Sequence, residues 1–338
     1  MVTAMRTLLV ENNPADQAAI QRIFQSQGLD HALEIADSHA QALRCLKVSS
    51  YPAGRLFCFG LGFSSQALAE RLLSKGWEVS GTLRSRKDEI KAQRIPALPF
   101  DGFHSTQEIS TAISSATHLL VTIPPQPSGD VVLENFAEEI SKARHLQWIG
   151  YISSTGVYGS AQGDWVDESS PLRAGTESNR RRIAVESAWL NLGKNHGLPV
   201  MIFRCVGIYG PGRNLLVSVR EGRARRIDKP GLVFSRIHSE DLAQTLEASM
   251  KKPQPGEVYN VSDDCPSPPA EAVEYACNLL GVQPPPLVPY AEADLSPTAR
   301  GFYTTNKRIS NKKIKQELGV KLRYPDYRSG LRALLKDF

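Results

Sequence analysis

The fold of this chain is decided by Arg55-Leu56-Phe57-Cys58-Phe59-Gly60-Leu61-Gly62-Phe63-Ser64-Ser65, which continues as Gln-Ala-Leu-Ala-Glu-Arg-Leu-Leu. A short apolar run breaks into a Gly-x-Gly-x-x-Ser turn, and apolar residues then recur at helical spacing. The pattern predicts a buried strand, a tight turn and a helix. The start of such a helix offers free N–H groups and the positive end of the helix dipole, which together favour a diphosphate.

The glycine turn is typical of dinucleotide binding. Gly60 permits the tight turn and Gly62 lets the backbone approach the phosphates, while Phe63, Ser64 and Ser65 begin the helix. Ser65 stands where a third glycine is usual, and its small side chain still allows close packing of helix on strand. The glycine pattern alone leaves a plain strand–turn–helix open, so the cofactor prediction depends on the segments that follow.

The second strand indicates which dinucleotide binds. An apolar stretch is followed here by a basic turn, in the segment Trp77-Glu78-Val79-Ser80-Gly81-Thr82-Leu83-Arg84-Ser85-Arg86. A coenzyme without a 2′-phosphate is normally held by an Asp or Glu about twenty residues after the glycines, but no carboxylate follows here before Asp88. Arg84 and Ser85 suit a 2′-phosphate, because a guanidinium forms paired charge-assisted hydrogen bonds with it. The segment favours NADP(H) over NAD(H); arginines that only solvate a surface turn are the alternative.

Apolar runs and helical patterns then alternate along the chain. The expected segments are a third strand ending at Pro99-Phe100-Asp101, a fourth strand from His118 to Ile123, a helix from Val131 to Ala143, a fifth strand from Leu146 to Ser153 and a sixth from Val200 to Arg204. This alternation predicts an α/β fold, a Rossmann-type doubly wound parallel sheet with a smaller C-terminal substrate-binding subdomain.

The ends of these strands supply further cofactor candidates. Ile123 and Pro124 follow the fourth strand, and Arg204 ends the sixth. Asp101 ends the third strand and is placed to accept a hydrogen bond from the adenine amine; a solvated loop acid is the alternative.

Composition limits the class of protein. The chain has 338 residues, of which 41% are hydrophobic and 22% charged, with a net charge of +5. This charge suits an anionic ligand but does not indicate nucleic acid, and no apolar run is long enough to span a membrane. Five cysteines without Cys-x-x-Cys spacing predict reduced thiols, a cytoplasmic location and no metal site.

The chain is expected to divide into three parts. Residues 1–52 resemble the opening half of a response-regulator receiver domain, with strands at Met5–Val10 and His31–Ile35 and a second helix at Ala40–Leu46, but the strand that carries the phosphorylated aspartate does not follow. Residues 54–205, with 232–262 returning to them, are assigned to the NAD(P)-binding Rossmann domain. Residues 206–231 and 263–338 are assigned to the substrate-binding subdomain. Within and beside it we expect helices at Leu215–Ile227, Ser310–Leu318 and Tyr327–Leu335 and a short strand at Val233–Ile237.

Several segments together resemble the NAD-dependent epimerase/dehydratase family, the extended branch of the short-chain dehydrogenase/reductase superfamily. They are Ser153-Ser154-Thr155-Gly156-Val157-Tyr158-Gly159, Asp167-Glu168, Gly207-Ile208-Tyr209-Gly210-Pro211-Gly212, Arg236-Ile237-His238-Ser239-Glu240-Asp241 and Tyr259-Asn260-Val261-Ser262. The resemblance runs from about residue 54 to the C-terminus. It implies an enzyme that acts on a small-molecule substrate and a homodimer paired through two helices.

The resemblance also assigns catalytic roles. Ser154, with Thr155 beside it, matches the group that donates a hydrogen bond to the reacting oxygen; a polar strand end is the alternative. The Tyr-x-x-x-Lys element is degenerate, because Ser178 stands in the Tyr position and Arg182 in the Lys position. A serine cannot pass a proton as a tyrosine does, and Arg182 supplies positive charge without deprotonating. Tyr158 is the nearest alternative proton donor.

A basic cluster follows in the segment that binds substrate in this family. Arg213, Arg220, Arg236 and His238 are the candidate substrate-binding residues, and Asp241 is expected to cap the helix that follows it. A charged helix face is the alternative for the arginines. The sequence thus predicts an NADP(H)-dependent oxidoreductase or epimerase-like enzyme for a small polar carbonyl or hydroxyl substrate. The arginines favour an anionic substrate, and the resemblance implies one that is similar to a sugar nucleotide. The missing Tyr and Lys leave a second interpretation open, a non-catalytic NADP(H)-binding redox sensor or scaffold.

Overall fold

The computed structural model describes residues 7–10, 13–26, 33–36, 54–84 and 95–338. The chain divides into two units, residues 1–54 with 75–78 and residues 55–74 with 79–338. In the first unit, strands β1 (Thr7–Val10) and β2 (Leu33–Ala36) pair in parallel, and helix α1 (Pro14–Ser26) lies between them in the chain. The helix expected at Ala40–Leu46 lies outside the described residues.

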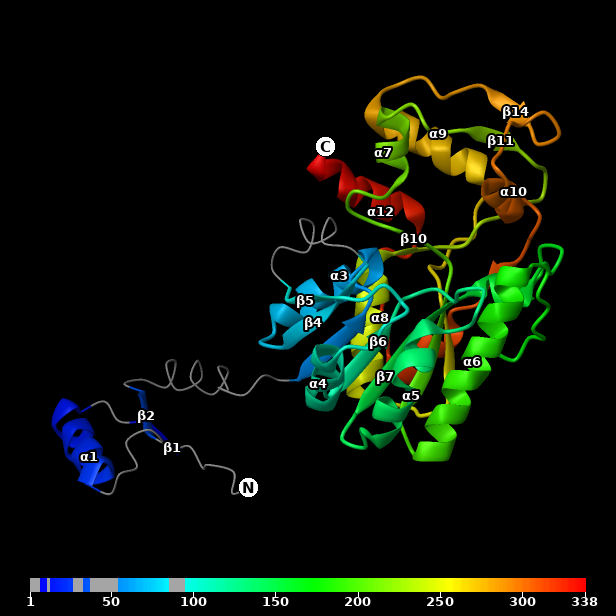
Figure 1. Ribbon diagram of the computed structural model, residues 1–338. Helices are drawn as coiled ribbons and strands as arrows, with labels where there is room; N and C mark the ends of the chain where they lie inside the picture. The colour runs from blue at the N-terminus through cyan, green and yellow to red at the C-terminus, as the bar shows by residue number, and fades with distance from the viewer. Residues whose placement is uncertain (1–6, 11–12, 27–32, 37–53, 85–94) are drawn as a thin grey trace. The chain divides into compact units, whose positions relative to one another are not determined.

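The second unit is built on a seven-stranded parallel sheet with the order β13-β9-β7-β6-β3-β4-β5 (Figure 1). Its strands are β3 (Arg55–Phe59), β4 (Glu78–Leu83), β5 (Ala97–Pro99), β6 (His118–Val121), β7 (Trp148–Ser154), β9 (Val200–Cys205) and β13 (Val258–Val261). The winding of the chain reverses between β3 and β6, which is the position where ligands bind in open α/β sheets.

Helices cover both faces of this sheet (Figure 1). One layer contains α4 (Gln107–Ser115), α5 (Val131–Lys142) and α6 (Glu177–His196), and the other contains α3 (Phe63–Leu73) and α8 (Ser239–Lys251). Strands β6 and β9 are buried along their whole length, as expected for central strands with helices on both sides. The predicted doubly wound parallel sheet is confirmed.

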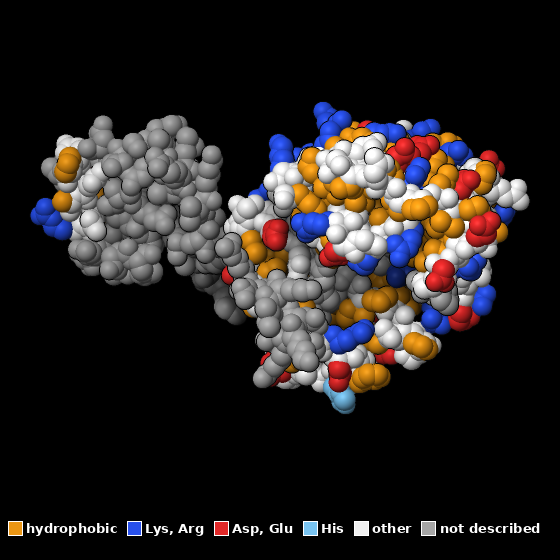
Figure 2. Space-filling view, turned by 90° about the horizontal axis from the view of Figure 1, so that it is seen from above, with side chains coloured by type: hydrophobic (Ala, Val, Ile, Leu, Met, Phe, Trp, Pro, Cys, Tyr) orange, Lys and Arg blue, Asp and Glu red, His pale blue; other side chains and the backbone are white. Residues whose placement is uncertain are grey.

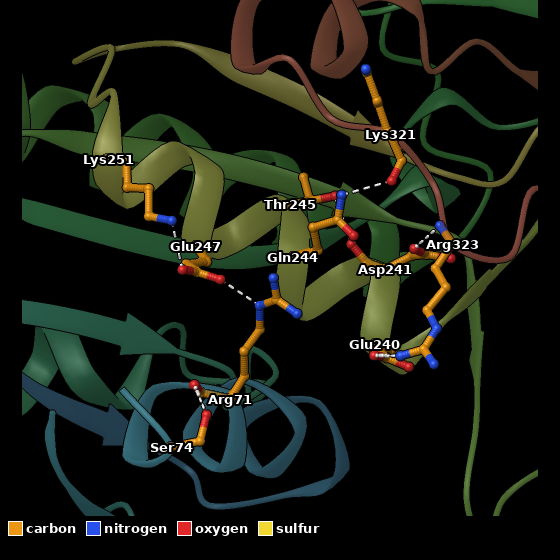
Figure 3. Close-up of polar contacts among 10 residues, drawn as sticks. All are labelled: Arg71, Ser74, Glu240, Asp241, Gln244, Thr245, Glu247, Lys251, Lys321 and Arg323. Carbon is orange, nitrogen blue, oxygen red and sulfur yellow. Dashed lines mark hydrogen bonds and ion pairs between the residues drawn. The ribbon is translucent and has the colours of Figure 1, made fainter. Parts of the chain in front are cut away.

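Polar contacts fix α8 against its neighbours (Figure 3). Glu247 on α8 is 3% exposed and forms ion pairs with Arg71 of α3 and with Lys251. Asp241 accepts hydrogen bonds from the backbone N–H groups of Arg323, at 2.7 Å, and Tyr324, at 2.9 Å. Its carboxylate therefore anchors a C-terminal loop, and the expectation that Asp241 caps α8 is wrong.

The remaining elements form a smaller layer and short connecting pairs. They are η3 (Thr155–Tyr158), β8 (Trp165–Val166), β10 (Gly207–Tyr209), α7 (Leu215–Arg220), β11 (Arg226–Asp228), β12 (Arg236–His238), α9 (Pro269–Leu280), β14 (Leu287–Pro289), α10 (Pro297–Tyr303), β15 (Arg308–Ile309), α11 (Lys312–Leu318), α12 (Tyr327–Leu334) and η4 (Leu335–Asp337). Helices α7, α9 and α12 pack around Tyr209, Leu216 and Tyr327.

The helix expected at Leu215–Ile227 is shorter than predicted. Helix α7 ends at Arg220, because Gly222 adopts a φ of +66° that turns the chain away. Strand β11 follows and pairs in parallel with β14. The predicted C-terminal helices agree with α11 and α12 to within two residues.

One face of the molecule carries mixed charges (Figure 2). On the face shown in Figure 2, basic side chains are scattered among acidic and apolar ones. Within the described part of the chain, no helix combines the length and the hydropathy that crossing a membrane requires.

Candidate functional site

The two glycines after β3 have different surroundings. Gly60 adopts a φ of +94°, and a Cβ atom there would lie 2.7 Å from the Thr122 hydroxyl oxygen. A Cβ atom on Gly62 would meet no atom within 4 Å. Helix α3 begins at the next residue, Phe63, and no side chain caps its N-terminus. The turn thus leaves open space beside free helix N–H groups, the arrangement that a phosphate needs.

Three hydroxyl groups hold this turn in place. Thr82 Oγ1 accepts a hydrogen bond from the Gly60 N–H at 2.9 Å, while Ser65 Oγ and Thr122 Oγ1 donate to the Gly60 carbonyl at 2.7 and 2.8 Å. Ser65 is fully buried, so its side chain supports the turn and does not reach a ligand. Thr82 and Thr122 were not predicted as site residues; their signal in the sequence is a threonine at the end of each strand that borders β3.

A crevice of about 1,080 Å³ opens above the turn. Its walls include seven predicted cofactor residues: Gly60, Gly62, Phe63, Arg84, Asp101, Ile123 and Pro124. Arg84 is exposed at the end of β4, and Ser85 lies outside the described residues. Ser64 stands in the first turn of α3. The structure therefore brings the glycine turn, Arg84 and the ends of β5 and β6 to one cavity.

Asp101 and Phe103 form one end of the crevice. Asp101 Oδ1 accepts the N–H groups of Phe103, at 2.8 Å, and His104, at 3.2 Å. These hydrogen bonds, together with the His104 side chain, lower the pKa of Asp101, so its carboxylate is ionised near neutral pH and available as an acceptor. Phe103 is 79% exposed and lines the same cavity. Phe103 was not predicted as a site residue, although it follows two positions after Asp101, the acid at the end of the third predicted strand.

Ser154 ends β7, the strand next to β6. Val121 of β6 pairs in register with Tyr151, so Ser154 lies at the same edge of the sheet as the crevice residues Ile123 and Pro124. Its hydroxyl oxygen accepts the Gly156 N–H at 3.1 Å and thereby caps η3. Thr155 beside it is buried.

The arginines at the start of α6 separate into two groups. Arg180 and Arg181 form ion pairs with Glu177 at 2.8 and 3.7 Å, so a local acid accounts for their charge. Arg182 turns toward the sheet and donates to the Ile152 carbonyl at 3.4 Å. Ser178, in the position of the usual tyrosine, is exposed.

Tyr158 and Arg204 lie in a buried network and not in the crevice. Arg204 Nη2 pairs with Glu186 at 2.7 Å, and the side chains of these two residues are 6% and 3% exposed. The Tyr158 hydroxyl accepts a hydrogen bond from Arg204 Nη1 at 2.9 Å and donates to Asn260 Oδ1 at 2.8 Å. Burial raises the pKa of Tyr158. The structure thus corrects two predictions. Arg204, predicted to bind the cofactor, forms a buried ion pair with Glu186. Tyr158, predicted as an alternative proton donor, has its hydroxyl hydrogen-bonded to Arg204 and Asn260.

The four predicted substrate residues occupy different places. Arg213 lines the crevice and also a second cavity, of about 280 Å³, whose wall includes Arg236. Arg220 is exposed, and its guanidinium lies 4.3 Å from the centre of the Phe338 ring.

His238 is buried and caps α8, with its Nδ1 accepting the Glu240 N–H at 3.1 Å. Burial lowers the pKa of His238 to about 4, so its imidazole is neutral at physiological pH. The structure therefore places Arg220 and His238 outside both cavities.

Comparison with known proteins agrees with this geometry. The family model for the NAD-dependent epimerase/dehydratase family matches residues 134–262. Protein YeeZ of Escherichia coli K12 is 29% identical over 283 residues, which cover 79% of this chain and 95% of that protein. A solved structure of a functionally unknown conserved protein from Silicibacter pomeroyi is 43% identical, with a TM-score of 0.76, and the match covers 84% of this chain and 99% of the other.

A more distant structure shows the same fold. The dTDP-glucose 4,6-dehydratase of Bacillus anthracis, solved in complex with NAD, is 18% identical, with a TM-score of 0.67 and coverage of 84% of this chain and 96% of the other. Residues 134–262 are thus similar to the NAD-dependent epimerase/dehydratase family, and the parallel sheet and the glycine turn agree with that match.

Proposed function

We propose that this protein is an NADP(H)-dependent oxidoreductase or epimerase-like enzyme for a small polar carbonyl or hydroxyl compound, with an anionic substrate favoured. The observation that carries the proposal is the crevice of about 1,080 Å³ at the switch point of the sheet. Its volume lies just above the upper end of the usual range for ligand pockets, about 300–1,000 Å³, which suits an extended dinucleotide.

The residues of the crevice fit a coenzyme diphosphate. Gly62 has open space where a side chain would stand, and the uncapped start of α3 lies directly after it. A bound nicotinamide coenzyme would supply the hydride. Arg84 at the rim supports a preference for the 2′-phosphate, since a guanidinium attracts the charge that a carboxylate at this position would repel.

The protein's own contribution would be to position and polarise the substrate. Ser154 would donate a hydrogen bond to the reacting oxygen, because it lies beside the wall formed by Ile123 and Pro124. Arg182 would add positive charge near the end of β7. Neither Ser178 nor Arg182 can pass a proton in the manner of the usual Tyr and Lys, so the proton would come from solvent or from the substrate itself.

The test is oxidation of NADPH, followed by absorbance, with a panel of small aldehydes, ketones and oxo acids. We expect turnover with at least one compound. Ser154→Ala should lower kcat about a hundredfold and leave coenzyme affinity unchanged, whereas Ser187→Ala, at an exposed position on α6, should change neither. Tight NADPH binding without turnover of any compound would contradict the proposal in favour of a non-catalytic binding protein.

A further inference from the structure

The cavity of about 280 Å³ is a separate compartment beside the coenzyme crevice. Arg213 belongs to the walls of both, and its guanidinium lies 5.3 Å from the centre of the Phe63 ring at the start of α3. Most of the wall is apolar or aromatic and comes from Ile208, Tyr209, Leu215, Phe234, Tyr327 and Leu331. The cavity thus combines a hydrocarbon-like interior with arginines.

Arg236 lines this cavity and retains unused hydrogen-bond donors. Its Nη1 donates to the Phe234 carbonyl at 3.1 Å and to Ser267 Oγ at 2.8 Å. A guanidinium carries five N–H groups, and the three on Nε and Nη2 have no acceptor among the described residues. The Tyr327 and Phe234 rings lie 5.5 and 6.0 Å from the guanidinium carbon, so the group lies against aromatic side chains. Nε and Nη2 form the side of a guanidinium that binds a carboxylate through two parallel hydrogen bonds.

The charge of Arg236 also lacks a direct counterion. In the part of the chain that the structure describes, no carboxylate forms an ion pair with it. Asp263 is the nearby acid; its N–H donates to the Arg236 carbonyl at 2.7 Å, and its side chain is buried. Burial raises the pKa of Asp263 to about 8, so this carboxyl group is largely protonated at neutral pH. A desolvated, uncompensated charge is unfavourable, and a bound anion would relieve it.

We propose that this cavity binds the carboxylate of a small organic acid through Nε and Nη2 of Arg236, with Arg213 between the acid and the coenzyme crevice. The inference rests on the proposed function, because it identifies this acid as the substrate. The cavity volume of about 280 Å³ lies just below the usual range for ligand pockets, about 300–1,000 Å³, so a nucleotide sugar is too large for it. The two free donors on Nε and Nη2 match the two oxygens of a carboxylate, which makes a carboxylate the proposed occupant.

The test is ligand-observed NMR titration of the full chain with benzoate, benzamide and phenyl phosphate, without coenzyme. We expect benzoate to bind at least tenfold more tightly than benzamide, since only the carboxylate accepts both charge-assisted bonds. Arg236→Gln should abolish this difference. Arg220→Gln, which removes an exposed arginine outside the cavity, should leave it unchanged.

Equal binding of benzoate and benzamide to the wild type would overturn the proposal, as would a benzoate preference that survives Arg236→Gln. Tighter binding of phenyl phosphate than of benzoate would overturn the assignment to a carboxylate. If Arg236→Gln does not fold, the wild-type comparison of charged benzoate with neutral benzamide still tests the proposal. Failure of the proposed function is read separately, as absence of NADPH oxidation with the carbonyl panel, a measurement that does not depend on benzoate binding.

Discussion

At the scale of single residues, Gly60 and Gly62 serve different purposes although they are two positions apart. Gly60 is required by the backbone, because its φ of +94° and the nearby Thr122 hydroxyl exclude a side chain. Gly62 is unrestricted within the protein itself, because a Cβ atom there meets no neighbour within 4 Å. Its missing side chain leaves room for the ligand.

This difference predicts different outcomes for two alanine substitutions. Gly60→Ala should lower the free energy of unfolding by about 1–2 kcal/mol or more, the cost of a left-handed conformation, and weaken NADPH binding as well. Gly62→Ala should leave stability nearly unchanged and weaken only NADPH binding. Urea denaturation and a coenzyme titration measure the two effects. Equal destabilisation by both variants would contradict this division of roles.

His238 predicts a specific pH dependence of stability. Its pKa is about 4 in the folded protein because of burial, below the usual value of about 6.5. As pH falls below 6.5, the unfolded chain takes up the proton first, so stability is lost. His238→Asn keeps a side-chain acceptor at the start of α8 without the titration. Between pH 7 and 5.5 the free energy of unfolding of the wild type should fall by about 1 kcal/mol more than that of His238→Asn. Urea midpoints that change equally with pH in the two proteins would disprove this prediction.

At the scale of secondary-structure elements, a buried ion pair joins α6 to β9. Arg204 donates to both carboxylate oxygens of Glu186, and Ser153 of β7 donates to the same carboxylate. The Tyr158 hydroxyl extends the network to Asn260 of β13. This network ties three adjacent strands to the helix that carries Arg182.

Glu186→Gln should therefore destabilise the protein strongly. It leaves the Arg204 charge buried without a partner, a loss of about 3–5 kcal/mol. Glu138→Gln on α5 is the matched control, because Glu138 pairs with Lys142 on an exposed surface, where ion pairs contribute little. Chemical denaturation checks both variants, and a Glu186→Gln protein as stable as the control would show that the pair is not a structural support.

The sequence predicted buried central strands better than short peripheral ones. It also identified functional motifs better than it predicted which of their side chains are buried. Central strands such as β6 appear in the sequence as continuous apolar runs because they are buried on both faces. Strands β11 and β14 have three residues each, with polar or proline-containing sequences, and their pairing depends on distant segments. Motifs identified Tyr158 and Arg204, but only the fold shows that the two side chains bind each other in the interior.

At the scale of the whole molecule, the crevice is formed within one unit of the chain. The residues that line it fall between Gly60 and Arg213 and belong to residues 55–74 and 79–338. We therefore expect removal of residues 1–52 to leave NADPH affinity unchanged. Calorimetric titration of the full-length and shortened proteins measures this, with circular dichroism as the control for folding. A tenfold loss of affinity in a folded shortened protein would assign the N-terminal segment a role in binding.

The most direct test of coenzyme binding is a fluorescence titration with NADPH and NADH on the wild type and on Arg84→Ala. Because Arg84 is exposed at the rim of the crevice, the wild type should prefer NADPH by about tenfold, and the variant should lose that preference while still binding both coenzymes. Arg144→Ala, at an exposed position outside the crevice, should behave as the wild type. Binding of neither coenzyme at millimolar concentration, or an NADPH preference unchanged in Arg84→Ala, would contradict the assignment.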